Sequence, residues 1–330
     1  MNKKTIVIIL IGMLLLLGAC SDSDSEAEVS DLDDLTLMLN WTPNAHHSGI
    51  YLAEANGWYE EAGINLEIVD AAGAGNEKVV AEGGADIGLS QAESLLPARQ
   101  AGVDVKAVAA LLPANDSAFM SLKAKGVERP KDLEGLTNGG FEGALEAEII
   151  SKLVECDGGD PSKVEFIGVG NVDYVAGLEE DKFDFVWVFD GWDVLRATQL
   201  GKDVNSLSLD DYKECIPNWY TPLVFADSDN ADSELTKKFL EITAKGYAAV
   251  VEDPDAAADA FIKLVPEADE ELVRASIAYY APLFNAGDDW GKMDTDTWAE
   301  FSKFLAEADE TYENQDDVWQ GAFTNDALLG

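Results

Sequence analysis

The pair Asn40-Trp41 is the first place in the chain whose side chains could bind a ligand. It follows an apolar run at 35–39, and a helical pattern begins near Ser48, so the segment predicts strand, loop and helix. Ligands of α/β sheets bind where loops leave the carboxyl ends of strands. An amide beside an indole can hydrogen-bond the edge of a flat heterocycle and stack on its face. A turn-forming Asn followed by a core Trp is the alternative interpretation.

Further loops carry groups that suit binding. Gly139–Gly143 precedes a helical pattern at 144–155, so its N–H groups could face a ligand, although flexible loop glycines also explain the pattern. Asp190-Gly191-Trp192 ends an apolar strand and fits either a site or a turn beside a core Trp. The aromatic residues placed on loops are Trp41, Trp58, Tyr59, Phe141, Trp192, Trp219 and Tyr220. Aromatic walls with few polar groups suit binding without reaction.

The residues that commonly hold metals or act as nucleophiles form no known motif. His46 and His47 are the only histidines, and the chain has no zinc-binding Cys spacing and no nucleophile elbow. The segment 227–231 begins like a calcium loop but lacks the required ligand and glycine, so we interpret it as a helix-capping acidic turn. The sequence therefore predicts no metal, no cofactor and no hydrolase site.

The elements that must position these loops follow an α/β pattern. Strands and helices alternate in a first lobe at 35–121, with a strand at 64–69 and a helix capped by Asn76. A second lobe at 122–219 carries a helix capped by Asn171. The chain returns at 220–330, where four helical patterns are expected to pack on the first lobe. Each lobe is predicted to be a doubly wound sheet, and two crossings would form a hinged cleft.

The N-terminal segment predicts an exported lipoprotein. Basic residues precede an apolar run at 6–17, which is shorter than the roughly 20 residues of a membrane span. Residues 17–20 resemble a lipobox, which makes 1–20 a signal peptide and Cys20 the lipidated residue; an ordinary cleavage site is the alternative. Residues 21–34 are nearly all Ser, Asp, Glu and Ala, as expected for a flexible tether. The mature protein would lie outside the cytoplasmic membrane, anchored by the lipid.

The net charge of -42 is spread along the whole chain. Such a field repels nucleic acid and disfavours strongly anionic ligands, so a neutral or cationic small molecule fits better. The charge also suggests a saline habitat, since salt screens self-repulsion. Cys156 and Cys215 could form one disulfide in an oxidising compartment, and the sequence leaves this pairing open.

Several segments together resemble one family. The segments are Leu39–Asn44 with His47, Gly49–Tyr51 and Gly57–Tyr59, Ala85–Leu89, the glycines around Gly140, Cys156–Asp160, Trp187–Trp192, Asn218–Pro222, and Tyr279 through Trp290. They are similar to the family that unites fungal thiamine-pyrimidine synthases with substrate-binding lipoproteins of bacterial ABC importers. The resemblance covers essentially all of the mature chain and implies the two-lobe, type II periplasmic-binding-protein fold.

This resemblance also bears on catalysis. The synthases use a lysine that holds pyridoxal phosphate, a reacting histidine and a cysteine-rich segment. The corresponding positions here look like Ser90, Ser94 and 216–220. A hydroxyl can neither form the Schiff base nor donate the ring nitrogen, so the resemblance implies a binder and not an enzyme.

The implied ligand is an aminopyrimidine related to the pyrimidine half of thiamine, either the formylated aminomethyl compound or the hydroxymethyl one. Riboflavin is the main alternative, and a sulfonate fits less well because cations are scarce in these loops. The implied partners are the permease and ATPase subunits of an importer. The residues expected at the ligand are Asn40, Trp41, His47, Glu93, Phe141, Glu142, Asp190, Trp192, Trp219 and Tyr220. His47 is either a loop anchor or a hydrogen bonder at the cleft edge, and His46 is expected to be solvated.

Overall fold

The computed structural model describes residues 32–330 except 73, 74, 142, 171, 286, 288, 315, 329 and 330. The predicted signal peptide with Cys20, most of the predicted tether, Glu142 and the predicted cap Asn171 therefore lie outside the described residues. Strand β1 spans Asp33–Met38 and so starts before the predicted lobe boundary at Leu35. The reason is pairing, since Asp33 N donates to Gly63 O at 2.9 Å.

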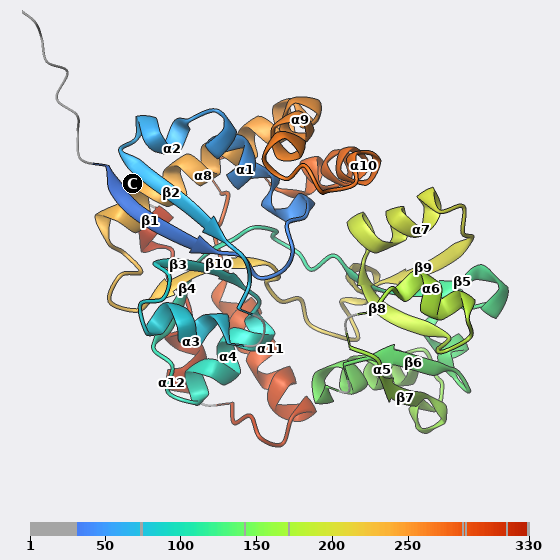
Figure 1. The fold of residues 1–330 in the computed structure, drawn as a ribbon. Helices are drawn as coiled ribbons and strands as arrows, with labels where there is room; N and C mark the ends of the chain where they lie inside the picture. The colour runs from blue at the N-terminus through green and yellow to red at the C-terminus, as the bar shows by residue number, and fades with distance from the viewer. Residues whose placement is uncertain are drawn as a thin grey trace, which may run out of the picture. The chain divides into compact units, whose positions relative to one another are not determined.

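The first sheet has five strands in the order β2-β1-β3-β10-β4. Its strands are β1, β2 (Ile64–Val69), β3 (Ile87–Ser90), β4 (Val105–Ala110) and β10 (Leu223–Asp227). β10 runs antiparallel to both neighbours, so the sheet is mixed. The helices of this part are α1 (Ser48–Ala55), α2 (Trp58–Glu61), α3 (Asn76–Ala81) and α4 (Ala92–Gln100), shown in Figure 1.

The second sheet has the order β7-β6-β8-β5-β9. Its strands are β5 (Ser117–Leu122), β6 (Thr137–Gly140), β7 (Glu165–Gly168), β8 (Phe185–Phe189) and β9 (Val204–Ser208). Its helices are α5 (Ala144–Cys156), α6 (Tyr174–Glu179), a π-helical turn η5 (Asp190–Val194) and α7 (Leu195–Gln199). β5 pairs with β8 and β9, so the second lobe begins at Ser117 and not at the predicted residue 122. Asp173 caps α6 by accepting from Ala176 N.

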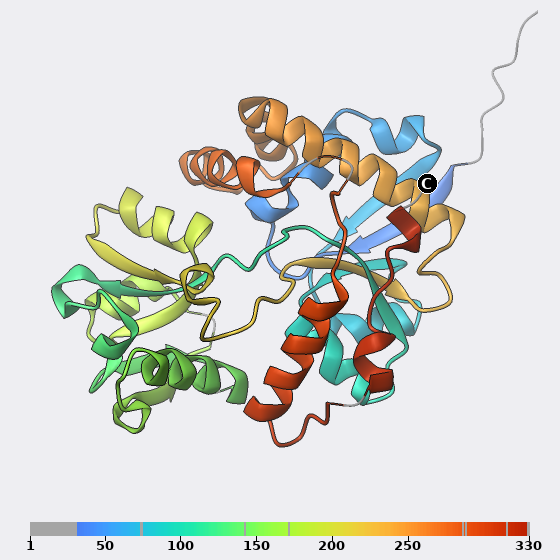
Figure 2. The same cartoon turned by 180° about the vertical axis from the view of Figure 1, so that it is seen from behind.

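The C-terminal helices cover the first lobe, as the sequence predicted. They are α8 (Glu234–Glu252), α9 (Pro254–Leu264), α10 (Glu270–Tyr280), α11 (Thr295–Ala308) and α12 (Asp316–Gln320). α8 and α9 pack on α1, and Figure 2 shows α8 from the other side. α1 and α8 approach at two glycines, because a Cβ on Gly246 would lie 2.1 Å from Gly49 O. α11 also contacts α5 of the second lobe, which the sequence did not indicate.

Short 3-10 turns complete the fold. They are η1 (Ala45–His47), η2 (Lys123–Lys125), η3 (Pro130–Leu133), η4 (Pro161–Lys163), η6 (Leu209–Tyr212), η7 (Ala281–Leu283) and η8 (Asp326–Leu328). The acidic turn at 227–231 is a turn as predicted, with Asp227 Oδ1 accepting from Asp229 N at 3.0 Å. However, it is Ser233 that caps α8.

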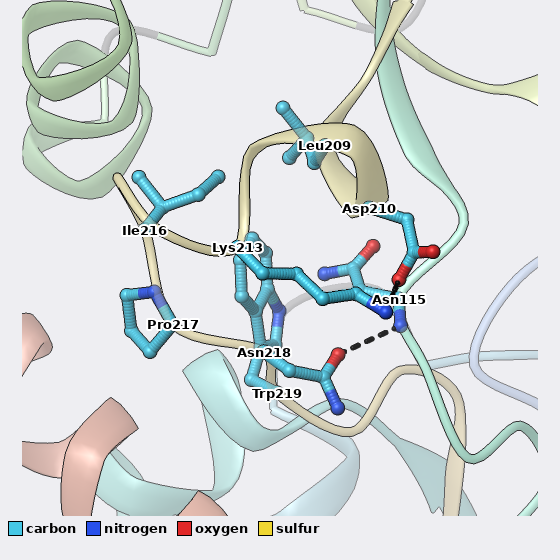
Figure 3. Close-up of a pocket in the computed structure, with 8 residues that line it drawn as sticks. All are labelled: Asn115, Leu209, Asp210, Lys213, Ile216, Pro217, Asn218 and Trp219. Atoms are coloured by element: carbon cyan, nitrogen blue, oxygen red, sulfur yellow. Dashed lines mark hydrogen bonds and ion pairs between the residues drawn. The ribbon is translucent and has the colours of Figure 1, made fainter. Parts of the chain in front are cut away.

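The two crossing segments, 111–116 and 209–222, are hydrogen-bonded to each other. Asn115 N donates to Asn218 Oδ1 at 2.9 Å, and Asn218 Nδ2 donates to Pro113 O at 3.1 Å. Figure 3 shows the small pocket beside this contact, lined in part by Trp219. Its volume of about 10 Å³ leaves room for no more than one water molecule, so it is no site for a heterocycle.

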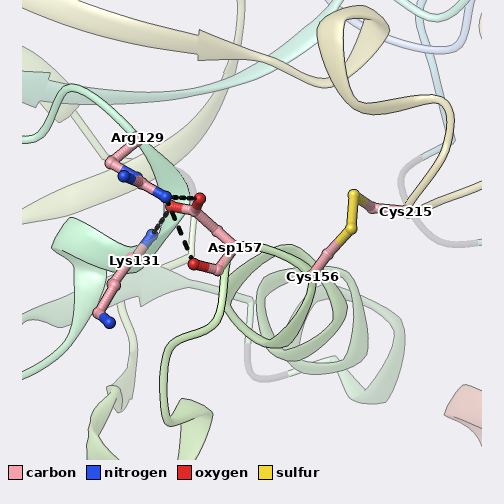
Figure 4. Close-up of a disulfide and its surroundings, with 5 residues drawn as sticks. All are labelled: Arg129, Lys131, Cys156, Asp157 and Cys215. Carbon is pink, nitrogen blue, oxygen red and sulfur yellow. Dashed lines mark hydrogen bonds and ion pairs between the residues drawn. A yellow bond between two sulfur atoms is a disulfide. The ribbon is translucent and has the colours of Figure 1, made fainter.

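A disulfide joins the second crossing to the second lobe. Cys156 ends α5 and Cys215 follows η6, with Cα atoms 5.9 Å apart (Figure 4). This answers the pairing that the sequence left open. Beside it, Arg129 Nε donates to Asp157 Oδ2 at 2.6 Å. The second crossing segment is therefore fixed to α5 of the second lobe near its own middle.

Among the described residues, no helix combines the length and apolar character that a membrane crossing needs. In the same part of the chain, no group of three or more His, Cys, Asp or Glu side chains is arranged to hold a metal ion.

Candidate functional site

A pocket of about 620 Å³ lies where β1 and β3 end, on the first lobe. This volume falls within the range of small-molecule sites. The lining residues are Asn40, Trp41, Thr42, Ala71, Gly75, Asn76, Glu77, Leu89, Ser90, Gln91 and Ser94. No Lys, Arg or His is among them, so the pocket presents amides, hydroxyls, one carboxyl group and one indole.

Asn76 holds the ends of the two strands together under the pocket. It was expected to cap a helix, but Gly75 takes the cap position with φ 119° and Asn76 is buried. Its Nδ2 donates to Leu39 O at 2.8 Å and to Leu89 O at 3.2 Å, while its Oδ1 accepts from Ala72 N at 2.9 Å. Because both amide hydrogens are used within the fold, Asn76 shapes the site and offers no donor to a ligand.

His47 fixes the orientation of Asn40. Its Nδ1 accepts from Asn44 N at 3.3 Å, which places the proton of the neutral ring on Nε2. Nε2 lies 3.0 Å from Asn40 Oδ1 and so donates to it. Burial lowers the pKa of His47 to about 3, so the ring stays neutral at physiological pH. The Asn40 oxygen is occupied, and its NH₂ group is left for the pocket. Of the two roles considered for His47, the anchor matches this geometry.

Trp41 provides an open aromatic surface next to Asn40. Its side chain is 45% exposed and lines the pocket. An indole that is this exposed beside an amide donor can stack on a flat ring while the amide bonds the ring edge. The sequence interpretation of Asn40-Trp41 as a binding pair therefore agrees with their placement, and the alternative of a core Trp does not.

Polar groups at the end of β3, on α3 and at the start of α4 complete the pocket, and the sequence did not predict most of them as ligand contacts. The Ser90 hydroxyl donates to Glu77 Oε1, and Gln91 Nε2 donates to Ser94 Oγ at 3.2 Å. Ser90 and Ser94, which by resemblance correspond to the reactive residues of the synthases, both line the pocket. The signal that could have found Glu77 was its place in the first helical turn after β2, at the same edge of the sheet.

Two predicted site residues, Trp219 and Tyr220, lie in the interior, and a third, Glu93, is partly exposed but has a buried carboxyl oxygen. Trp219 is 1% exposed and stacks on Phe301 with centroids 5.1 Å apart. The Tyr220 hydroxyl accepts from Asp294 N at 2.7 Å. Burial raises the pKa of Glu93 to about 8, and its Oε2 has no partner among the described residues. α11 covers Trp219 and Tyr220, so neither ring presents an open face.

The other predicted residues belong to the second lobe. Phe141 is 57% exposed, and its N donates to Glu146 Oε2 at 3.0 Å. Asp190 accepts from the Ser206 hydroxyl, and burial together with the charge of Asp116 raises the pKa of Asp190. Trp192 is half-buried against the core of the first lobe. None of these side chains lines the 620 Å³ pocket.

His46 was predicted to be solvated, and this is wrong. It is 6% exposed, with Nε2 3.3 Å from Asp116 Oδ2. Its ring centroid lies 4.4 Å from that of Tyr280 and 5.5 Å from that of Phe189. The cause is coverage by α10 and by the end of β8, which are distant in sequence and gave no local signal.

The chain matches a known protein family in sequence and resembles solved structures in fold. The family described as NMT1/THI5 like matches residues 44–257. The fold is that of periplasmic binding proteins: the alkanesulfonate-binding protein SsuA from Xanthomonas axonopodis pv. citri superposes with a TM-score of 0.67 at 12% identity, covering 89% of this chain and 99% of that one.

Curated relatives include both binding proteins and synthases. A formylaminopyrimidine-binding protein of Halalkalibacterium halodurans is 26% identical over 92% of this chain and 94% of its own. A 4-amino-5-hydroxymethyl-2-methylpyrimidine phosphate synthase of Legionella pneumophila is 24% identical over 84% and 89%. A riboflavin-binding protein of Chloroflexus aurantiacus, RibY, is 25% identical over 91% and 87%.

Proposed function

Because the chain belongs to the NMT1/THI5-like family, we propose that it is an extracytoplasmic solute-binding lipoprotein of an ABC importer, with an aminopyrimidine precursor of thiamine as its ligand. The observation that carries the ligand class is the pair Asn40-Trp41, whose exposed indole stands beside an amide that His47 holds as a donor. A formylaminopyrimidine or hydroxymethylpyrimidine ring offers a flat face and a ring-nitrogen acceptor to such a pair.

The lining of the pocket supports a neutral or weakly basic ligand. With no cationic side chain in the lining, an alkanesulfonate would be bound without a counter-charge, which is costly in a partly dry site. A pyrimidine needs no such partner. The proposed site is completed from the second lobe by Phe141, Glu142, Asp190 and Trp192, in the manner of hinge closure around a ligand.

Binding without catalysis is the second part of the proposal. Ser90 and Ser94 face the pocket at the positions compared with the synthases. Neither hydroxyl can form a Schiff base with pyridoxal phosphate. Incubation with pyridoxal phosphate and iron should therefore give no Schiff-base absorbance and no pyrimidine product. Formation of either would contradict this part.

The proposed location and partners follow from the lipobox resemblance at Cys20 and from the fold. Lipidation of Cys20 would hold the protein on the outer face of the cytoplasmic membrane, next to the permease and ATPase subunits of the importer. Metabolic labelling with a fatty acid should mark the wild-type chain and leave a Cys20→Ser variant unlabelled. Equal labelling of both would contradict the anchor.

Isothermal titration calorimetry tests the ligand class. The panel is formylaminopyrimidine, hydroxymethylpyrimidine, thiamine, riboflavin and an alkanesulfonate, each titrated into residues 32–330, which form one compact unit. We expect binding of at least one of the two pyrimidines, and no binding of the sulfonate. If riboflavin alone binds, the proposed ligand is wrong and riboflavin, which the RibY relative is named for binding, takes its place. The assignment as a binding protein would stand in that case.

A further inference from the structure

Glu77 lies at the start of α3 and is the carboxyl group that lines the pocket. We propose that Glu77 selects amino heterocycles over oxo heterocycles, by accepting a hydrogen bond from the exocyclic amine of the ligand. This inference rests on the proposed function and adds a specificity-determining residue to it.

The bonding of Glu77 leaves one oxygen for a ligand. The residue is 5% exposed, and the Ser90 hydroxyl donates to its Oε1. Its Oε2 has no hydrogen-bond partner among the described residues, although the side chain reaches the pocket. A carboxylate taken out of water is costly unless donors surround it. A donor on the ligand would supply what the fold does not.

The nearest basic side chain along the chain does not neutralise Glu77. Lys78 Nζ pairs instead with Glu82 at 3.7 Å, and both of these side chains are more than two-thirds exposed. Lys78 does not line the pocket, and neither does any other Lys, Arg or His among the described residues. Glu77 is thus free to accept from a neutral amine, and it would repel a carbonyl oxygen placed at the same position.

Asn40 supplies the opposite polarity. Its oxygen is occupied by His47, so it presents NH₂ hydrogens to the ligand. The pocket therefore offers a donor at Asn40 and an acceptor at Glu77. A 4-aminopyrimidine carries both complementary groups, a ring nitrogen that accepts and an amine that donates. Its 4-oxo counterpart carries a carbonyl in place of the amine, and sites built for such a bond reject an analogue that lacks it.

Calorimetry with a matched ligand pair tests the inference. The ligands are the aminopyrimidine of the panel above that the wild type binds more tightly and its 4-oxo counterpart, titrated into the wild type, Glu77→Gln and the exposed control Glu82→Gln. We expect the wild type and Glu82→Gln to prefer the amine at least tenfold, and Glu77→Gln to lose most of that preference. Thermal unfolding checks that each variant is folded. Glu77→Asp, which keeps the charge and withdraws the carboxylate by one methylene group, should also lose the preference.

The outcomes separate this inference from the proposed function. If the wild type binds the amine and Glu77→Gln or Glu77→Asp keeps the full preference, the function stands and the role of Glu77 is refuted. If the wild type binds neither hydroxymethylpyrimidine nor formylaminopyrimidine, or prefers the oxo compound, the aminopyrimidine function and the role of Glu77 both fail.

Discussion

His46 Nε2 lies 3.3 Å from Asp116 Oδ2, and this contact joins η1 of the first lobe to the segment that crosses into the second lobe. The Tyr280 hydroxyl on α10 donates to the same oxygen. The carbonyl of Asp116 accepts from Asp190 N at 3.3 Å. One buried carboxyl group thus connects the first lobe, the C-terminal helices and the crossing segment.

Tyr280→Phe should destabilise the fold by about 1.5–3 kcal/mol, because Asp116 loses a donor and its other oxygen already has no partner among the described residues. Urea unfolding measures this loss. Tyr279→Phe is the control, since Tyr279 is 38% exposed and adjacent in sequence. Equal stability of the two variants would show that the hydrogen bond from the Tyr280 hydroxyl to Asp116 contributes nothing to the free energy of unfolding.

Glu93→Gln should change how stability depends on pH. Burial raises the pKa of Glu93 from 4.5 to about 8, so the folded state keeps a proton that the unfolded state loses. The contribution of Glu93 to the free energy of unfolding has its full value below pH 4.5, and it falls as the pH rises toward 8. The variant should gain about 1–3 kcal/mol over the wild type between pH 5 and pH 8. Urea unfolding at pH 5 and pH 8 measures this difference in the free energy of unfolding. The control Glu82→Gln should show the same pH dependence as the wild type. A constant difference between Glu93→Gln and the wild type would contradict the burial argument.

Loss of the disulfide should cost about 3–4 kcal/mol, because Cys156 and Cys215 close a long loop of the unfolded chain at a separation of 59 residues. Chemical unfolding of the Cys156→Ala, Cys215→Ala double variant measures the loss. Dithiothreitol should destabilise the wild type to the same degree and leave the double variant unchanged. If dithiothreitol destabilises both proteins equally, it does not act through the Cys156–Cys215 disulfide.

Salt should stabilise the protein. The net charge of -42 makes self-repulsion large, and the Debye length falls from about 10 Å at 0.1 M to about 3 Å at 1 M salt. We expect the melting temperature to rise by several degrees over this range. Sucrose at matched osmolality controls for solute exclusion. Unfolding curves that do not move with salt would remove the suggestion of a saline habitat.

Where side-chain patterns were regular, the sequence predicted the fold well. Alternation over 64–69 gave β2 with the observed bounds, and the helical pattern over 144–155 gave α5, which ends one residue later at Cys156. β9 was missed because Val204–Ser208 carries no such pattern; it lies at the end of the described sheet order, where it pairs with β5. The lobe boundary was misplaced although Pro113, Asn115 and Asp116 interrupt the apolar pattern directly before β5, because the prediction assigned residues 117–121 to the first lobe.

The site was predictable only in part, for a related reason. The placement of Asn40-Trp41 at the pocket was predictable because a strand end marks a sheet edge. Trp219 looked equivalent, but long-range packing under Phe301 decides its burial. Glu77 resembled any other acidic residue in a chain with 64 Asp and Glu, and only the pocket distinguishes it.

The central claim is that a flat aminopyrimidine binds in the pocket beside Trp41. Calorimetric titration of 4-amino-5-hydroxymethyl-2-methylpyrimidine into the wild type, Trp41→Ala and Trp58→Ala tests it most directly, because Trp58 lies under Lys245 and away from the pocket lining. Loss of the stacking surface should cost Trp41→Ala about 1–3 kcal/mol of binding free energy, while Trp58→Ala binds as the wild type does. Equal binding by Trp41→Ala and the wild type would contradict the claim.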